Sequence, residues 1–340
     1  MRYKWIFLCI AIVASLYGCE KEENPVKDEM TVTREIFAMD TYMSLSATGE
    51  KAEEALDESV NEILRLDELL SVGKEESEIY TINNSGSAIL SDDTAKLIET
   101  SIELYSSTKG AFDITIFPLM ETWGFTTKQY KVPDKSEINS ILKNVSASKI
   151  EYNGKEKTIK LPKGVQIDLG GIAKGYTSNR IMEIFEEYSI ESGMVSLGGN
   201  VQLYGRKPDG SLWKIAVENP KDEANYVGVL QIEDKAVITS GGYERYFEEN
   251  GVNYHHILDP NTGYPARSGL ISVTIVSEDG TMADGLSTAL FVMGKQKALE
   301  YWKNHSEKFD AILVEEDGNI TITKGLEGIF SSDYEFSVEE

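Results

Sequence analysis

The stretch "VQIDLGGIAKGY", Val165–Tyr176, holds the change of pattern from which the fold is inferred. An apolar run ends at Asp168, a pair of glycines follows, and a helical pattern begins near Ala173. This order predicts a strand, a turn and a helix. The dinucleotide fingerprint G-x-G-x-x-G and the phosphate loop G-x-x-x-x-G-K-[ST] are both absent from the stretch. The two common nucleotide-binding motifs of parallel α/β proteins are therefore not indicated.

The residues of this stretch nevertheless suit a phosphate compound. Gly170 and Gly171 carry no side chain, so a ligand can approach the main chain closely. The free N–H groups of the following helix favour an anion, and Lys174 adds a positive charge. Asp168 can accept hydrogen bonds from a sugar or a base. A plain strand-to-helix turn with a surface lysine is the alternative, and the stretch alone leaves both open.

The flanking sequence indicates the fold class. Apolar residues at helical spacing predict helices at 51–71, 91–110, 134–145, 173–188, 281–294 and 295–305. Residues 31–48 predict one strand or a bent pair, and further strands are predicted at 194–199, 213–218 and 236–242. Hairpins are predicted at 149–162, 243–258 and 309–325, where Asn-Gly or Asp-Gly pairs mark the turns. Grouped helices with frequent hairpins indicate an α+β fold of mixed, largely antiparallel sheets with packed helices.

The N-terminus "MRYKWIFLCIAIVASLYGC" has a short basic start and an apolar run too short to span a bilayer comfortably. Leu16–Cys19 resembles the lipobox at which bacterial lipoproteins are cleaved and acylated. We expect a lipoprotein signal peptide at 1–18, a lipidated (palmitate-bearing) Cys19 with a flexible tether at 19–30, and the functional domain at 31–340. The expected location is a bacterial membrane, lipid-anchored on the extracytoplasmic side. An uncleaved membrane anchor is the alternative.

The charge of the chain limits its partners. The formal net charge is −24, and it becomes −26 once residues 1–18, with Arg2 and Lys4 and no acid, are removed. Such a surface repels nucleic acid, whose binding depends on phosphate neutralisation. A phosphate ligand would need a local site, with a divalent cation to offset the charge. Cys9 would leave with the signal peptide, so a disulfide is excluded in the mature chain.

Three other segments carry candidate functional groups. In "TMADGLSTALF", Asp284 and Thr288 are one helical turn apart, and both offer hard oxygen ligands for magnesium or calcium. Helix N-terminal chemistry alone is the alternative there. In "YHHILDPNTGYPA", adjacent histidines on a strand face opposite sides, so one can point into a site as an acid or base. In "VSLGGNVQLYG", a glycine pair marks either a close backbone approach or a β-bulge.

Together, these motifs resemble one family. The segments "AMDTYMSL", "GAFDITIFPLMETWGF", "IDLGGIAKGY", "SLGGNV", "ITSGGYERYF", "YHHILDPNTGYP" and "ADGLSTAL" occur in the order typical of the FAD:protein FMN transferases, the ApbE family. The resemblance covers about residues 34–294 and implies that family's T-fold-related architecture. It also implies magnesium-dependent transfer of FMN from FAD to a threonine or serine of an acceptor protein, with release of AMP. The expected acceptors are redox proteins facing the same compartment.

The resemblance also implies roles for residues at matching positions. Metal ligands would be Asp284, Thr288 and the carbonyl of Gly171. His256, not His255, matches the family histidine and is our candidate for the catalytic base. FAD would contact the following residues: Met39, Ala111, Phe112, Asp113, Asp168, Lys174, Gly199 and Asn200.

The chain departs from the family pattern at three places. Asp40 stands where the family often has glycine, Gly73 stands near the position of an aromatic residue that stacks on the flavin, and Gly242 replaces a frequent aspartate or asparagine. Two other activities remain open from sequence. One is hydrolysis of FAD to FMN and AMP, and the other is flavin binding by a lipoprotein without catalysis.

Overall fold

The computed structural model describes residues 31–222 and 224–340, so the expected signal peptide, Cys19 and the tether lie outside the described residues. The helices are α1 (Ala52–Leu70), α2 (Glu78–Ser85), α3 (Asp92–Ser107), α4 (Phe117–Thr122), α5 (Lys135–Leu142), α6 (Ala173–Glu187), α7 (Gly280–Met293) and α8 (Lys295–Lys303), with 3-10 turns η1 (Ile114–Ile116), η2 (Ala147–Lys149) and η3 (Lys324–Leu326). Within these residues, no helix is long and apolar enough to cross a membrane.

The strands form one large sheet and smaller ones. The large sheet has the order β1-β2-β6-β7-β10-β13-β14-β15-β17, and a second sheet has the order β16-β9-β8. All neighbouring strands of the large sheet are antiparallel except β15 and β17, which confirms the predicted α+β class. The strands are β1 (Thr31–Ala38), β2 (Thr41–Thr48), β3 (Ser87–Ile89), β4 (Glu151–Asn153), β5 (Thr158–Lys160), β6 (Ser192–Leu197), β7 (Asn200–Tyr204), β8 (Trp213–Glu218), β9 (Tyr226–Ile232), β10 (Ala236–Gly241), β11 (Tyr246–Glu249), β12 (Val252–His255), β13 (Leu270–Ser277), β14 (Phe309–Glu315), β15 (Ile320–Thr323), β16 (Phe330–Ser331) and β17 (Phe336–Glu339).

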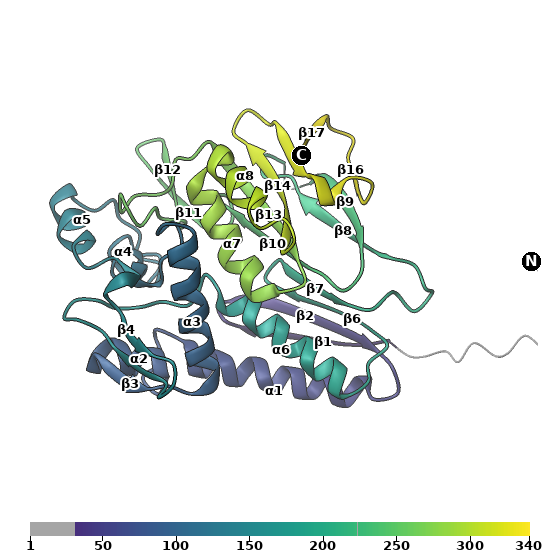
Figure 1. Ribbon diagram of the computed structural model, residues 1–340, viewed down its shortest axis with the longest axis horizontal. Helices are drawn as coiled ribbons and strands as arrows, with labels where there is room; N and C mark the ends of the chain where they lie inside the picture. Colours follow the sequence, from purple (N-terminus) through teal and green to yellow (C-terminus); the bar gives the residue numbers. More distant parts are fainter. Residues whose placement is uncertain (1–30, 223) are drawn as a thin grey trace, which may run out of the picture.

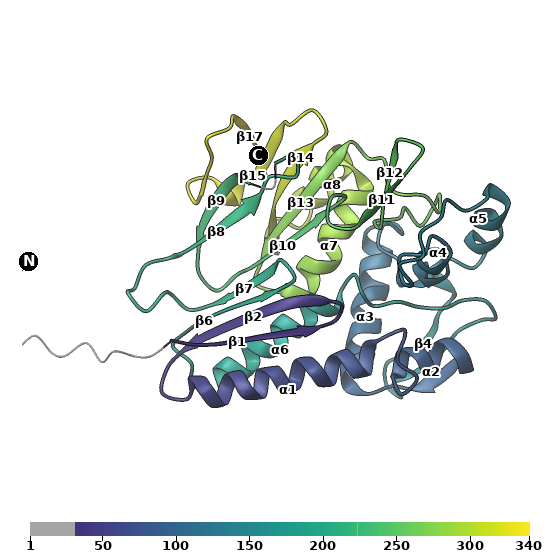
Figure 2. The ribbon, with the colours of Figure 1, turned by 180° about the vertical axis from the view of Figure 1, so that it is seen from behind.

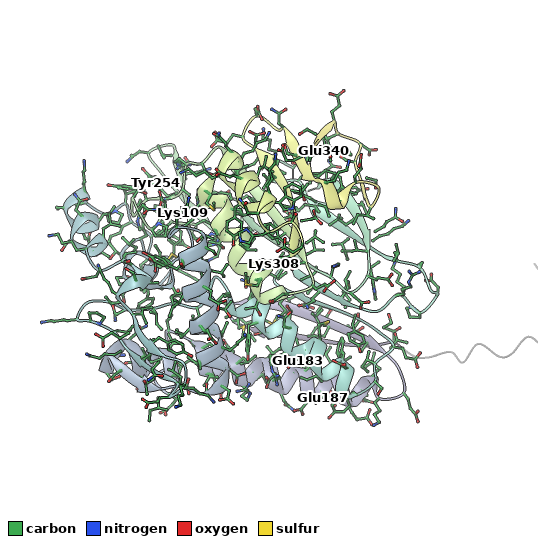
Figure 3. All side chains as sticks on the ribbon, in the orientation of Figure 1. Lys109, Glu183, Glu187, Tyr254, Lys308 and Glu340 are labelled. Atoms are coloured by element: carbon green, nitrogen blue, oxygen red, sulfur yellow. The ribbon has the colours of Figure 1, made fainter. Side chains whose placement is uncertain are left out.

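The long helices cover one face of the large sheet. Helices α1, α6, α7 and α8 lie in front of the sheet in Figure 1, and Figure 2 shows the strands from behind. The small sheet of β8, β9 and β16 packs on the opposite face, over the C-terminal strands. Helices α2 to α5 gather at one end of the molecule. The surface is covered with charged side chains, such as Glu183 and Glu187 on the exposed side of α6 (Figure 3).

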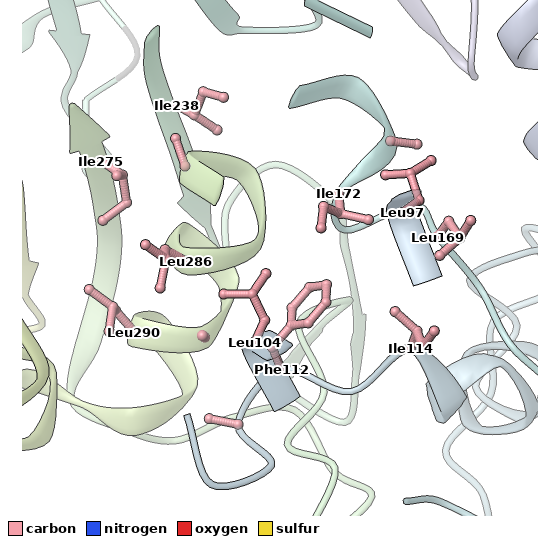
Figure 4. Packing of buried hydrophobic residues seen from close by; sticks show 14 of the residues in the cluster. Leu97, Leu104, Phe112, Ile114, Leu169, Ile172, Ile238, Ile275, Leu286 and Leu290 are labelled. Atoms are coloured by element: carbon pink, nitrogen blue, oxygen red, sulfur yellow. The ribbon is translucent and has the colours of Figure 1, made fainter. Parts of the chain in front are cut away.

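The main core lies where α7 meets the sheet. Leu286 and Leu290 of α7 lie beside Ile238 of β10 and Ile275 of β13, and all four are buried (Figure 4). The segment before α6 and the loop after α3 also send apolar side chains into this core, as Ile172 and Phe112 show. This packing fixes the start of α6 and the middle of α7 against each other. Residues far apart in the chain are thereby held in one place.

The prediction of a strand over the apolar run that ends at Asp168 is wrong. The apolar side chains of Val165, Ile167 and Leu169 are buried, but the segment belongs to no strand. Its backbone bonds instead to a side-chain amide: Ile167 N–H donates to Asn83 Oδ1 at 2.7 Å, and Asn83 Nδ2 donates to the Ile167 carbonyl at 2.8 Å. Asp168 N–H donates to the Ile114 carbonyl at 2.8 Å. A buried apolar run needs partners for its backbone groups, but they need not come from a sheet.

The turns agree better with expectation. Residues 31–48 form a hairpin, β1–β2, whose two turn residues Met39 and Asp40 have φ of 49° and 59°. Asn250 and Gly251 close the β11–β12 hairpin as predicted. Gly198 and Gly199 are the two turn residues of the β6–β7 hairpin, so the β-bulge alternative is wrong. A Cβ on Gly198 would lie 2.3 Å from Thr41 Oγ1, so a close approach does require glycine there.

Candidate functional site

Two adjoining cavities contain the candidate site residues. The smaller cavity, about 200 Å³, is lined by the following: Ala111, Phe112, Asp113, Asp168, Gly171, Lys174, Asn200, His256, Asp284 and Thr288. The larger, about 670 Å³, is lined by Met39, Lys174 and Gly199 among others. Lys174, Thr239, Glu244 and Arg245 line both, so they form a shared wall. A larger hollow of about 980 Å³ elsewhere contains none of the expected site residues.

Asp284 joins three elements at the smaller cavity. It lies on α7 and is only 5% exposed. Its Oδ2 accepts the N–H of Gly175 at 2.9 Å, and its Oδ1 accepts Asn200 Nδ2 at 3.1 Å. Gly175 is in the first turn of α6, and Ile172, the residue before that helix, provides no side-chain cap. The carboxylate therefore satisfies a free helix N–H at the positive end of α6.

The crossing of α6 and α7 depends on glycine. A Cβ on Gly175 would lie 2.1 Å from the Gly280 carbonyl oxygen and 2.6 Å from Asp284 Cβ. A Cβ on Gly280 would lie 2.7 Å from Ser178 Oγ and 2.9 Å from the Gly175 carbonyl oxygen, both on α6. Contacts this short are repulsive, so any side chain at either position would force the helices apart. The two glycines thus set the distance between the start of α6 and Asp284.

The oxygen groups of this cavity suit a hard cation. Thr288 lies one turn after Asp284 on α7, and its Oγ1 is 3.2 Å from Ser240 Oγ. Each Asp284 oxygen accepts one hydrogen bond from the protein and so keeps a lone pair. With Gly171 on the same cavity, the donors present are a carboxylate, a hydroxyl and a backbone carbonyl. In residues 31–222 and 224–340 no group of three or more His, Cys, Asp or Glu gathers around a metal position, so a cation held here would need phosphate oxygens or water as further ligands.

Positive charge faces the same space. Lys174 lies in the first turn of α6, and Arg245 Nη2 donates to the Phe125 carbonyl at 2.9 Å, which fixes its position. Asp168 Oδ1 accepts the N–H of Gly170 at 2.8 Å. Burial raises the pKa of Asp168, while this N–H and the charges of Arg245 and Lys174 oppose the rise. An anionic ligand thus meets two cations at the shared wall.

The two histidines have different surroundings, but not through strand alternation, because β12 ends at His255 and His256 lies in the bend that follows. His255 is buried, its Nε2 lies 3.0 Å from the Ala266 carbonyl, and its ring contacts Phe291 edge-on. His256 lines the smaller cavity, and its Nδ1 lies 3.2 Å from the Arg245 carbonyl. Burial first, then the charge of Arg245, lowers the pKa of His256 to about 3. The ring is neutral near pH 7, with Nδ1–H donating and Nε2 free to accept a proton.

Two further acidic residues line these cavities. Asp113 lines the cavity, but its Oδ1 accepts the N–H and hydroxyl of Thr115, and its Oδ2 accepts the N–H of Ala147 at 3.2 Å. Its carboxylate therefore holds the loop in place. Glu244 received no role from sequence, yet it lies on the shared wall. Partial removal from water raises the pKa of Glu244 to about 7; the charge of Lys174 opposes the rise, and Asp284 and Glu218 add to it.

Comparison with known proteins identifies the family. The model of the ApbE family matches residues 39–313. This chain belongs to the ApbE family.

Its relatives within the ApbE family cover nearly its whole length. The FAD:protein FMN transferase of Haemophilus influenzae is 30% identical over 328 residues, which are 92% of this chain and 94% of that protein. The crystal structure of the ApbE protein of Thermotoga maritima superposes with a TM-score of 0.83 at 34% identity, covering 88% of this chain and 99% of that one. The flavin transferase ApbE of Vibrio cholerae gives a TM-score of 0.80 at 26% identity, with 88% and 99% covered.

The structure explains one departure from the ApbE pattern. Asp40 occupies a hairpin turn position with positive φ, where Gly, Asn and Asp are the favoured residues. Aspartate therefore replaces glycine there with little backbone strain. Gly73 is exposed between α1 and α2 and lines neither cavity. Gly242 packs against the ring of His255, where a Cβ would lie 3.0 Å from Cδ2.

Proposed function

We propose that this chain is a magnesium-dependent FAD:protein FMN transferase. An acceptor threonine or serine hydroxyl oxygen bonds to the FMN phosphorus, the bond from that phosphorus to the bridging oxygen breaks, and AMP leaves with that oxygen. The observation that carries the proposal is the single cavity in which Asp284, Lys174 and His256 meet. These residues come from distant parts of the chain and combine oxygen ligands, a cation and a neutral base.

FAD would span the two cavities, with its pyrophosphate at the shared wall between Lys174 and Arg245. Met39 lines the larger cavity, which we assign to the flavin. Asp284, Thr288 and the Gly171 carbonyl would hold Mg²⁺, which when bound supplies positive charge to the pyrophosphate oxygens. Phosphoryl transfer depends mainly on positioning and charge neutralisation, so this acidic chain needs such a local site.

His256 would take the proton of the acceptor hydroxyl. Its Nδ1 is held by the Arg245 carbonyl, which leaves Nε2 as the accepting atom. A pKa of about 3 makes the ring a weak base in the free protein. The negative charge of a bound pyrophosphate opposes the lowering by Arg245 and Lys174, and so raises the basicity of His256 when FAD arrives.

The expected location adds a restriction on acceptors. We propose that Cys19 carries the lipid anchor on the extracytoplasmic side, which would place the domain beside membrane-bound or secreted redox proteins. Support comes from the lipobox-like sequence alone, since Cys19 lies outside the described residues. Mass spectrometry of the intact N-terminal peptide, with a cysteine-to-serine control, tests the acylation.

Transfer is tested with FAD, Mg²⁺ and solubilised membranes from cells that lack this gene. We expect covalent flavin fluorescence on a protein band after denaturing electrophoresis, and an FMN mass on a threonine or serine peptide of that band. Free FMN and AMP without labelled protein would indicate FAD pyrophosphatase activity instead. FAD binding without turnover under any divalent cation would indicate a flavin-binding lipoprotein.

A further inference from the structure

Strand β1 presents a free edge. It is the terminal strand of the large sheet and, among the residues that the structure describes, pairs only with β2. The two-residue turn makes Ala38 and Thr41 the closing hydrogen-bonded pair. Alternate residues along β1 therefore direct their N–H and C=O groups outward, namely Thr33, Glu35 and Phe37. In agreement, Tyr42, which is opposite Phe37, uses its carbonyl to accept from Gly198 N–H at 3.1 Å on the other side of β2.

An exposed aromatic pair lies on the same residues. Phe37 is 68% exposed and Tyr42 is 56% exposed, and the register places them directly opposite each other. Side chains of a directly opposite pair are in contact distance, so the two rings form one apolar surface. Large apolar side chains exposed together often mark a protein-binding surface. The backbone edge and the rings thus offer two kinds of contact to one partner.

The charge beside this edge is negative. Glu35 is exposed on the face that carries Phe37, and its carboxylate accepts from Tyr42, which raises the pKa of that phenol. Asp40 at the turn is exposed as well. Arg34, which is the only cation in the Thr31–Thr48 hairpin, is turned to α1, where it pairs with Asp57 at 2.8 Å. A segment that lies along β1 therefore meets acidic groups without a competing cation from the hairpin.

The hairpin leads to the site. Met39, Asp40 and Thr41, at its tip, line the larger cavity, and the hairpin forms the outer margin of the sheet (Figure 2). An extended chain advances about 3.3 Å per residue. A segment paired along Thr33–Phe37 would reach the rim of the cavity about two to four residues after its last paired position.

We propose that the free edge of β1, with the Phe37–Tyr42 pair, binds an extended segment of the acceptor protein and guides its hydroxyl residue past the rim of the larger cavity toward the shared wall. This inference rests on the proposed function. The segment adds a strand to the sheet, as in other cases of β-strand addition. It carries an apolar side chain opposite Phe37 and a lysine or arginine beside Glu35 or Asp40.

The test uses variants of the full-length chain with FAD, Mg²⁺ and solubilised membranes of cells that lack this gene. Glu35→Pro removes an outward N–H, and because that N–H is not bonded to β2, the hairpin keeps its hydrogen bonds. Glu35→Ala is the matched control that keeps the N–H. Glu35→Pro loses one hydrogen bond to the docked segment and leaves the carbonyl of that segment unpaired, so acceptor labelling should fall about tenfold. For Glu35→Ala, which keeps this hydrogen bond, labelling should fall about threefold or less.

A second pair of variants does not depend on the proline. Phe37→Lys replaces an exposed ring with a charge that repels a basic segment, and labelling should fall about tenfold. Ile89→Lys is its control, because Ile89 is 78% exposed on β3 and lines neither cavity. FAD binding and acceptor-independent release of FMN should stay at the wild-type level in all four variants.

The outcomes separate this inference from the proposed function. Absence of labelling by the wild type refutes the transferase itself. Labelling by the wild type that is unchanged in both Glu35→Pro and Phe37→Lys overturns the docking edge. If Glu35→Pro instead turns a dimer into a monomer in solution while labelling is unchanged, the edge serves a second copy of the chain, and the inference is also overturned.

Discussion

Two substitutions of Asp284 separate its structural role from its proposed role in metal binding. Asp284→Ala leaves the Gly175 N–H and the Asn200 amide, both buried, without their acceptor. A buried polar group that loses its partner costs about 1–3 kcal/mol, so with two such groups the free energy of unfolding should fall by about 2–6 kcal/mol. Asp284→Asn keeps the shape and one oxygen for the Gly175 N–H, and the Asn200 amide can rotate to present its own oxygen. We expect that variant to lose no more than about 1.5 kcal/mol.

In these two variants the loss of activity should not parallel the loss of stability. Neither side chain provides the charged oxygen ligand, so FMN release from FAD with Mg²⁺ should fall at least about 100-fold in both variants. Urea unfolding measures the stability difference, and chromatography of FAD, FMN and AMP over a Mg²⁺ titration measures turnover. Turnover by Asp284→Asn within about threefold of the wild type would refute metal binding by this carboxylate. An unchanged unfolding free energy in Asp284→Ala would refute its role in holding α6.

The remaining predictions concern three other positions around the cavities. Gly175→Ala should lower the free energy of unfolding by about 2 kcal/mol or more, because its Cβ would overlap the Gly280 carbonyl. Gly73→Ala, whose Cβ would meet only Ser71 Oγ at 4.0 Å, should change it by less than about 0.5 kcal/mol. Equal losses in the two variants would contradict the close crossing of the helices. His256→Ala should bind FAD normally but lose transfer activity by about 100-fold or more, whereas His305→Ala, outside both cavities, should keep that activity. A titration of flavin fluorescence measures FAD binding, and full transfer by His256→Ala would show that His256 is not the base. The pKa of Glu244 is raised to about 7 in the folded chain, which therefore holds a proton that the unfolded chain releases above about pH 4.5. Between about pH 4.5 and 7, the free energy of unfolding of the wild type should therefore fall more than that of Glu244→Gln. Parallel pH profiles of the two proteins in urea unfolding would contradict this.

Local patterns predicted much of the fold. The 3.6-residue spacing located α1, α3 and α7, and it placed Asp284 and Thr288 on one face of a helix. The turn pair Asn250–Gly251 fixed a hairpin, because its backbone prefers the positive φ found there. These features depend on residues within a few positions of each other. For that reason they can be inferred without knowledge of the rest of the chain.

Other elements were not predicted correctly, because the sequence patterns that indicate them are weak or depend on distant residues. The short helices α2 and α4 have no prediction, and the apolar segment Val165–Leu169 has the pattern of a strand without being one. Its outcome was decided by Asn83, whose side chain bonds Ile167 from 84 positions away. An apolar run indicates that a segment is buried. Which groups form hydrogen bonds with its backbone N–H and C=O groups depends on what the fold places beside it.

The sequence by itself determined the secondary structure of α6 and α7, the α+β class, and the placement of Asp284 and Thr288, the candidate oxygen ligands, on one face of α7. Only the tertiary structure brought Asp284 to the first turn of α6, against Gly175, and to Asn200 on β7. The family resemblance had already selected His256 over His255, and the structure adds that His256 lines the cavity whereas His255 packs against Phe291. Periodicity specifies which side of an element is buried, whereas the contact between Gly175 and Asp284 joins residues 109 positions apart. That contact exists because two glycines allow the helices to cross closely, and no local pattern contains this information.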